Sequence, residues 1–313
     1  MLRRISFAAA LLAGLLGASL GAAYAVALLR ETRPPEPPGE MLETALGPVH
    51  VVRWGDPGAA PVLLLHGTGA WGGLWAETGE ALGRAGWHAV AMDLPPFGFT
   101  PRADGADYAR AAQAVRVTAV AGVLGRPVLV AHSFGAGPGA EALLRDPERF
   151  GGAVIVAGAI GLGAEGGAPL VLRPFWLRRG LSGAALSPLL TRPLLASFLH
   201  RKEAATEEVA ALLRAPLGGV GMVDGVADWL PHLLGAGPGE LSRDPAAWQG
   251  LPVPLALIWG DMDDVTPPEQ GEALAQLTGA SLSLLEDVGH IPQIEAPEAF
   301  LEALLEALEA VSR

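Results

Sequence analysis

The sequence contains no cysteine. Disulfide bonds and thiolate metal ligands are therefore excluded, and cysteine chemistry gives no information on the compartment. Histidine is also scarce, with 7 residues in the chain, and none has a metal-ligand spacing such as His-Glu-x-x-His. We therefore expect a protein that works without a metal ion or a bound cofactor.

Basic residues are few, with 21 lysines and arginines against 33 aspartates and glutamates, which gives a net charge of −12. A chain of this charge repels phosphate backbones, so nucleic acid is not an expected partner. Hydrophobic residues make up 50% of the 313 positions. A sizeable core is available for one large α/β domain with an insertion, or for two small domains.

Charge is nearly absent from residues 5–29, which follow Arg3-Arg4. The length of this apolar run meets the roughly 20 residues of a transmembrane helix. Ala23-Tyr24-Ala25 has the small-x-small form of a signal-peptide cleavage site, which would give a secreted protein. Because the run continues past that site, we expect residues 1–33 to be an uncleaved membrane anchor, with the catalytic part outside the cytoplasm.

Residues 34–40 are rich in proline and predict a stiff linker. Beyond it, predicted strands alternate with predicted helices, and several strands are apolar throughout, which is typical of a parallel sheet covered on both faces. The alternation stops over residues 161–250, which are rich in leucine, proline and glycine. We expect an α/β core over residues 41–160 and 251–313, interrupted by a helical cap at 161–250.

The strongest local pattern is Ala131-His132-Ser133-Phe134-Gly135, which follows an apolar run and leads through glycines toward a helix at residue 140. A serine on a strand-turn-helix of this kind is held in strained geometry with its hydroxyl exposed, and small residues two positions away on either side allow the close approach. Taken alone, the pattern also fits a loop with an N-cap serine.

Two polar motifs follow the last two predicted strands. They are Gly260-Asp261-Met262-Asp263-Asp264 and Gly289-His290-Ile291-Pro292. A serine hydroxyl needs an imidazole to take its proton and a carboxylate to hold that imidazole. Carboxyl ends of parallel strands meet at one edge of a sheet, so we expect the serine, an aspartate and the histidine to meet there.

These motifs resemble those of the α/β-hydrolase superfamily, from Met41 to the C-terminus. The matching segments are His66-Gly67-Thr68-Gly69, Asp93-Leu94-Pro95-Pro96-Phe97-Gly98, Ala131-His132-Ser133-Phe134-Gly135, Gly260-Asp261-Met262-Asp263 with Pro267, and Gly289-His290-Ile291-Pro292 with Glu295 and Pro297. The chain departs from the family pattern at Ala131, where glycine is usual. The resemblance implies the α/β-hydrolase fold, with a mostly parallel sheet, helices on both faces and a helical cap.

The resemblance also implies roles for individual residues. Ser133 would be the nucleophile and His290 the general base. The family pattern Gly-x-x-Asp-x-x-x-Pro selects Asp263 as the acid. The backbone N–H groups of Thr68 and Phe134 would form the oxyanion hole.

Five aromatic residues are candidates for an apolar acyl or alcohol pocket beneath the cap. They are Phe97, Phe99, Phe175, Trp176 and Trp229. Packing of the cap against the core is an equally good explanation for them.

Some members of the superfamily have an aspartate at this turn. With a serine there, the chain resembles the esterases, lipases, carbon–carbon hydrolases and peptidases of the superfamily. We expect hydrolysis of a carboxylic ester, or a related acyl bond, of a small apolar substrate through an acyl-enzyme on Ser133. Alternatives are carbon–carbon bond hydrolysis, amide or peptide hydrolysis, a cofactor-free haloperoxidase-like activity, and a non-catalytic accessory protein with this fold. The sequence leaves the oligomeric state open.

Overall fold

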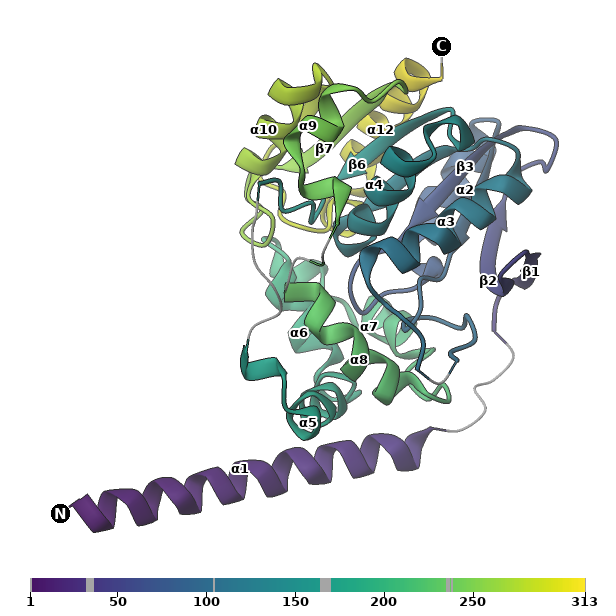
Figure 1. Cartoon of the computed structure of the whole chain (residues 1–313). Coiled ribbons are helices and arrows are strands. Elements are labelled where there is room, and N and C mark those ends of the chain that lie inside the picture. Colours follow the sequence, from purple (N-terminus) through teal and green to yellow (C-terminus); the bar gives the residue numbers. More distant parts are fainter. Residues whose placement is uncertain are drawn as a thin grey trace.

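The computed structural model describes residues 2–31, 37–103, 105–163, 170–234, 237 and 239–312. Its centre is an eight-stranded sheet in the order β1-β2-β4-β3-β5-β6-β7-β8 (Figure 1). The strands are β1 Glu40–Thr44, β2 Gly47–Trp54, β3 Ala60–Leu65, β4 Trp87–Met92, β5 Val128–His132, β6 Gly152–Val156, β7 Leu255–Gly260 and β8 Ser281–Leu285. Only the pairings of β2 with β1 and β4 are antiparallel among these strands. The mostly parallel sheet is confirmed.

The central strands are apolar because both of their faces are covered. Strands β5 and β6 are buried at every position, which suits their content of valine, isoleucine and alanine. The register pairs Leu65 with Ala131 and Ala131 with Ile155. The carboxyl ends of β3, β5 and β6 are therefore level, and the loops that leave them meet at one edge.

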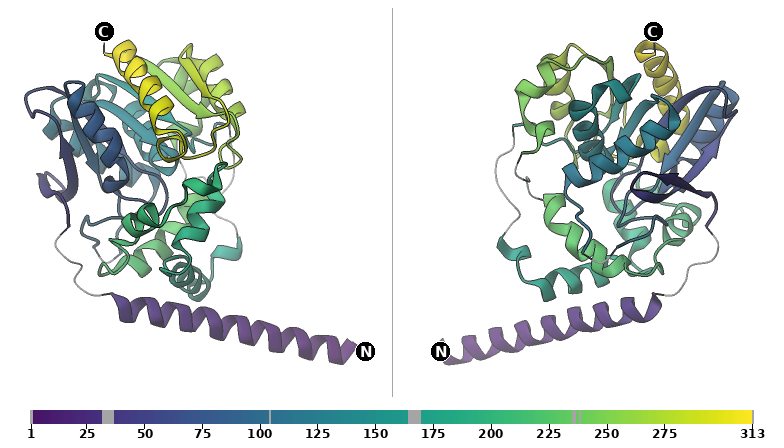
Figure 2. Two further views of the ribbon diagram at one scale, coloured as in Figure 1. Left: turned by 180° about the vertical axis from the view of Figure 1, so that it is seen from behind. Right: turned by 45° about the vertical axis from the view of Figure 1, so that its right-hand side comes forward.

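Helices cover the two faces of the sheet (Figure 2). One face packs against α3 (Arg110–Leu124), α4 (Ala136–Arg145) and α10 (Pro268–Thr278). The other packs against α2 (Ala76–Arg84) and α12 (Pro297–Val311). In α12, Phe300, Leu304 and Leu308 are fully buried, as the helical spacing of apolar residues predicts.

A cap of short helices is inserted between β6 and β7. It contains η4 Leu170–Leu172, α5 Phe175–Ala185, α6 Thr191–Phe198, η5 Lys202–Ala204, α7 Glu207–Arg214 and α8 Met222–Leu234. The last two elements of the insertion, η6 Leu241–Arg243 and α9 Pro245–Gln249, pack instead on α4 and α10 of the core. Helices α5, α6, α7 and α8 lie together at one end of the core (Figure 1). Their side chains share a cavity with Ser133, so the cap covers the carboxyl edge of the sheet.

Residues 2–30 form one long helix, α1 (Leu2–Arg30). Within the described part of the chain, no helix combines the length and the apolar character needed to cross a bilayer. This finding contradicts the predicted membrane anchor and the extracytoplasmic placement of the catalytic part that depended on it. From Gly14 onward, glycine, alanine, serine and Tyr24 alternate with the leucines, which dilutes the apolar character that length alone suggested.

The carboxyl-terminal half of α1 packs along the outer side of the cap (Figure 1). Gly180 and Gly183 of α5 allow this close approach, because a Cβ at Gly180 would lie 2.5 Å from the Cβ of Leu20. The Tyr24 hydroxyl donates to Asp224 of α8 at 2.9 Å. α1 therefore contacts both α5 and α8. Residues 34–36 of the predicted linker lie outside the described residues.

Candidate active site

Ser133 lies on a sharp turn between β5 and α4. Its φ is +51°, a left-handed value that is unfavourable for a residue with a side chain. Gly135 is required two positions later, because a Cβ there would lie 2.5 Å from the carbonyl oxygen of His66. Ala131 is accommodated by Gly139, where a Cβ would lie 3.1 Å from the Ala131 methyl group. The departure from the family pattern is therefore compensated one helical turn into α4.

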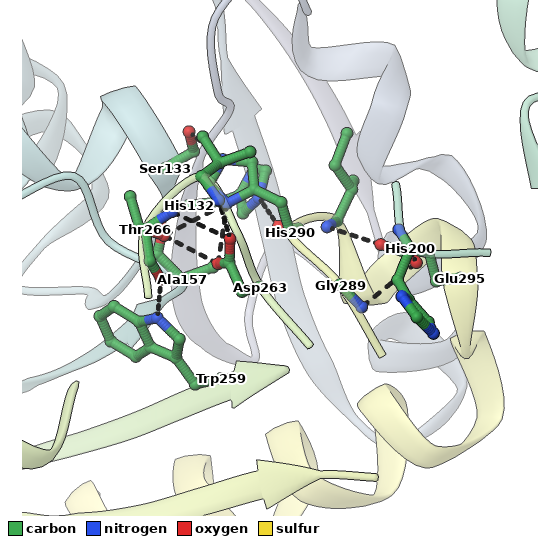
Figure 3. A network of polar contacts seen from close by, with 12 residues as sticks. His132, Ser133, Ala157, His200, Trp259, Asp263, Thr266, Gly289, His290 and Glu295 are labelled. Atoms are coloured by element: carbon green, nitrogen blue, oxygen red, sulfur yellow. Dashed lines mark hydrogen bonds and ion pairs between the residues drawn. The ribbon is translucent and has the colours of Figure 1, made fainter. Parts of the chain in front are cut away.

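Three side chains from separate loops form a hydrogen-bonded chain at the carboxyl edge of the sheet (Figure 3). The Oγ atom of Ser133 lies 2.7 Å from Nε2 of His290. The Nδ1 atom of His290 lies 2.9 Å from Oδ2 of Asp263. Ser133 is 7% exposed, Asp263 3% and His290 2%. The structure thus brings together the serine, the histidine and the aspartate that the sequence predicts as a group.

Asp263 is held by more than His290. Its Oδ1 accepts from the N–H groups of Val265 and Thr266, both at 2.9 Å. The Thr266 hydroxyl lies 2.8 Å from Asp263 Oδ2 and 3.0 Å from the Ala157 carbonyl oxygen. Burial acts to raise the pKa of Asp263, but the hydrogen bonds and charge of His290 and the hydrogen bonds of Thr266 outweigh it and lower that pKa. The carboxylate is therefore ionised at neutral pH.

Glu295 supports the loop that carries His290. Its carboxylate accepts from the N–H groups of Gly289 and Ile291, each at 3.2 Å, on either side of the histidine. The same carboxylate accepts from the N–H groups of His200 and Arg201 in the cap, each at 2.8 Å (Figure 3). A buried carboxylate that accepts four N–H groups fixes both segments. The sequence motif that contains Glu295 does not reveal this role, because two of the four donors come from the cap.

Two further histidines beside Ser133 are neutral. Burial, followed by the charge of His290, lowers the pKa of His132 to about 3. Its Nε2–H donates to the His290 carbonyl oxygen at 2.9 Å. Burial also lowers the pKa of His66, whose Nδ1–H donates to the Gly67 carbonyl oxygen at 2.8 Å and whose Nε2 accepts from the Leu94 N–H at 2.9 Å. Both imidazoles thus shape the loops around Ser133.

The loop of residues 66–70 lies directly against Ser133. A Cβ at Gly67 would lie 3.1 Å from the Ser133 Cβ and 3.0 Å from Nδ1 of His132, so glycine is needed for this approach. Thr68, the next residue, lines the same cavity as Ser133. Among the residues that the structure describes, no three His, Asp or Glu side chains are grouped as metal ligands would be.

Above Ser133 and His290 is a cavity of about 430 Å³ between the core and the cap. Its lining is mostly leucine and other apolar side chains. The residues are Gly67, Thr68, Gly69, Ala70, Leu74, Phe97, His132, Ser133, Leu172, Leu181, Ser182, Ala185, Leu186, Thr191, Leu194, Leu195, Phe198, Leu213, Leu217, Val226, Trp229, Leu230, Leu233, His290 and Ile291. A cavity of this size and character suits a small apolar ligand.

Two of the five predicted pocket aromatics, Phe97 and Trp229, line this cavity. The other three do not. Phe99 is buried, but its ring packs against Trp71, with 5.1 Å between the ring centroids. Phe175 and Trp176 are 47% and 62% exposed. They stand near the start of α5, about two helical turns before the residues of α5 that line the cavity.

The family model described as "Alpha/beta hydrolase family" matches residues 62–303. LipZ of Mycobacterium tuberculosis is 30% identical over 295 residues, which cover 86% of this chain and 95% of LipZ. A 2-hydroxy-6-oxononadienedioate/2-hydroxy-6-oxononatrienedioate hydrolase of Burkholderia vietnamiensis is 27% identical over 271 residues, which cover 82% of this chain and 90% of that protein.

A solved structure of a meta-cleavage product hydrolase from Pseudomonas fluorescens superposes with a TM-score of 0.70 at 24% identity, covering 87% of this chain and 97% of that one. At this identity the likeness concerns the fold. Together with the family model and the relatives, the strand order and the Ser133 turn lead to one conclusion: the chain belongs to the α/β hydrolase family.

Proposed function

We propose that the protein is a serine hydrolase that cleaves a carboxylic ester, or a related acyl bond, of a small apolar substrate through an acyl-enzyme on Ser133. One observation carries this proposal. The Ser133 hydroxyl oxygen lies 2.7 Å from Nε2 of His290, at the floor of a cavity whose walls are apolar. A general base and a nucleophile in contact with a substrate-sized cavity are the requirements of nucleophilic acyl transfer.

In this mechanism His290 takes the proton of Ser133 as Oγ attacks the ester carbonyl carbon. Asp263 accepts from Nδ1–H of His290, which leaves Nε2 free to receive that proton, and its charge stabilises the imidazolium that forms. His290 then gives the proton to the departing alcohol oxygen, and the acyl group stays on Ser133. Water, deprotonated by His290, attacks the acyl carbon and releases the acid.

The tetrahedral intermediates need two N–H donors aimed at the developing oxyanion. We assign these donors to the backbone of Thr68 and Phe134. Support comes from their position: Phe134 follows Ser133 on the turn, and Thr68 follows Gly67, whose backbone approaches the Ser133 side chain closely. Neutral His66 donates from Nδ1 to the Gly67 carbonyl oxygen and accepts at Nε2 from the Leu94 N–H. These two hydrogen bonds hold the loop in one orientation.

The cavity favours an uncharged, apolar acyl group. None of its described lining residues is a lysine, arginine, aspartate or glutamate. A methylene group and a water molecule occupy similar volumes, about 30 Å³, so a cavity of about 430 Å³ has room for a chain on the order of ten carbons. We therefore expect turnover to rise with acyl length up to medium-chain esters.

Carbon–carbon bond hydrolysis is the second candidate. The name of the Burkholderia vietnamiensis relative, 27% identical to this chain, gives a dicarboxylate as its substrate. A carboxylate that enters an apolar cavity needs a cationic partner, and the described cavity lining offers no lysine or arginine. The lining thus favours an ester over a substrate of that charge.

The test is covalent labelling of the full chain with a fluorophosphonate, beside Ser133→Ala, His290→Ala and a control, Ser197→Ala. Ser197 lies on the exposed side of α6, where its hydroxyl donates to the Leu194 carbonyl oxygen. We expect labelling of the wild type and the control, mapped to Ser133, and none of the other two variants. A folded wild type that resists the probe and hydrolyses no nitrophenyl ester would favour a non-catalytic accessory role.

A further inference from the structure

Ser182 of α5 is a buried hydroxyl in the wall of the cavity. Its side chain is 1% exposed, and its Oγ forms no hydrogen bond within the protein. A serine within a helix commonly satisfies its hydroxyl with a backbone carbonyl one turn earlier, as Ser197 does on α6 with Leu194. At Ser182 that bond is not made, so the hydroxyl is buried without a protein partner, which is unfavourable.

The indole N–H of Trp229 on α8 is a second buried group without a protein partner, on another residue that lines the same cavity. Its indole is 2% exposed, and its Nε1–H has no protein acceptor. The ring packs edge-on against Phe97 and Phe134, with centroid distances of 4.8 Å and 5.2 Å. These contacts hold the indole next to the residue that follows the nucleophile.

Other buried tryptophans of this chain show how unusual that N–H is. Trp71, Trp248 and Trp259 each donate to a backbone carbonyl oxygen, at 2.8, 2.8 and 2.7 Å. Trp75 also lacks an acceptor, but it lies in the core and does not line the cavity. Trp229 thus combines an unpartnered donor with a place in the cavity wall.

Ser182 and Trp229 both lie on helix faces that line the cavity. On α5, residues 181, 182 and 185 line the cavity, which is one face of a helix, and Leu186 directly after the helix continues it. On α8, residues 226, 229, 230 and 233 line the cavity in the same way. The two helices pack against each other in the cap (Figure 1). The remaining side chains that these helices contribute to the lining are alanine, valine and leucine. The Ser182 hydroxyl and the Trp229 N–H are therefore the polar side-chain groups that α5 and α8 contribute to an otherwise apolar part of the cavity wall.

We propose that Ser182 and Trp229 form a polar subsite that binds an uncharged oxygen, as a keto or hydroxyl group, carried on the acyl chain of the ester substrate. The indole N–H can only donate, whereas the serine hydroxyl can donate or accept, so an acceptor oxygen satisfies both groups. A carboxylate is disfavoured, because the lining provides no cation to balance it. This subsite rests on the proposed ester hydrolysis and names its substrate class.

The experiment compares pairs of nitrophenyl esters of medium-chain acids, one plain and one with a single keto group, moved along the chain. The wild-type full chain is measured beside Ser182→Ala, Trp229→Phe and the control Ser197→Ala. We expect the wild type and the control to prefer the keto ester at one chain position. That preference, as a ratio of kcat/KM values, should fall about tenfold in each cavity variant. Because both esters are measured on the same variant, a general loss of activity leaves this ratio unchanged.

Binding of the same pairs to Ser133→Ala separates this inference from the proposed function, since that variant cannot form the acyl-enzyme. Tighter binding of the keto ester, reduced about tenfold by adding Ser182→Ala, supports the subsite whether or not the wild type turns the ester over. Equal binding of both members at every keto position overturns the subsite. Preserved binding preference without any hydrolysis by the wild type would overturn the ester hydrolase and leave the subsite standing.

Discussion

The core side and the cap side of the cavity are built in opposite ways. On the core side, polar groups of Asp263 and Glu295 are buried and hydrogen-bonded to several donors each. On the cap side, apolar side chains predominate, and the two polar groups Ser182 and Trp229 have no protein partner. Satisfied networks fix one geometry, whereas an apolar wall selects by size and shape. Chemistry is thus assigned to the core and substrate choice to the cap.

The largest expected effect comes from breaking the core side at its acid. Asp263→Asn should lower kcat about 10⁴-fold on every ester, because the amide favours the wrong tautomer of His290. The matched control is Asp264→Asn, at the neighbouring exposed carboxylate, which should keep kcat. Steady-state kinetics on a short and a long ester measure both. If Asp264→Asn loses activity and Asp263→Asn keeps it, the acid is Asp264 and the assignment to Asp263 is wrong.

Glu295 tests whether the core side depends on its hydrogen-bonded supports. Glu295→Gln replaces an acceptor oxygen with an NH₂ group that faces backbone N–H donors, so the loop of His290 should shift. A displacement on the order of 1 Å lowers kcat by roughly 100-fold. The control is Glu302→Gln on the exposed side of α12. If kcat stays unchanged while only the unfolding temperature falls, Glu295 holds the cap to the core without positioning His290.

The buried neutral state of His132 predicts acid sensitivity. Burial lowers its pKa from 6.5 to about 3 in the folded protein, so between these values the unfolded chain binds a proton that the folded chain does not. Stability is therefore complete above pH 6.5 and falls as the pH drops. From pH 7 to 5 this group alone should reduce the free energy of unfolding by about 2 kcal/mol.

Urea unfolding of the wild type and His132→Gln at both pH values measures this contribution. The variant should lose about 2 kcal/mol less than the wild type over the same interval. Equal losses in the two proteins would mean that His132 takes up its proton in the folded state. In that case the hydrogen bond from its Nε2 to the His290 carbonyl oxygen would not define its tautomer.

The same contrast explains what the sequence could predict. Core motifs are local: a turn that forces a left-handed serine needs small residues at fixed positions, so Ala131 and Gly135 reveal it. The network around the acid was only partly visible, because the role of Thr266 depends on contact with Ala157, far away in the chain. Glu295 likewise acts through cap backbone that lies 95 residues earlier.

The cap was predictable as helical but not helix by helix. α8 contains Pro231, and α5 contains Gly180 and Gly183, residues that weaken helix signals. In the folded protein these glycines serve close packing against α1, a tertiary effect that local propensity cannot show. The pocket aromatics were also hard to predict from local sequence. Phe175 and Trp176 lie on α5, which lines the cavity, but they are exposed and outside the cavity itself. The predicted anchor was wrong, because no described helix combines the length and the apolar character that a bilayer requires.

The smallest expected effect tests whether the cap side selects substrates by the size of the acyl chain. Leu186, directly after α5, is 8% exposed and lines the cavity, so Leu186→Ala enlarges the space available to the acyl chain. We expect the ratio of kcat/KM for a long ester to that for a short ester to rise by up to about tenfold. On the short ester kcat should stay the same, because no core hydrogen bond is touched. An equal fall of kcat on both esters would show that the cap also positions the catalytic groups, and the division between the two sides would then fail.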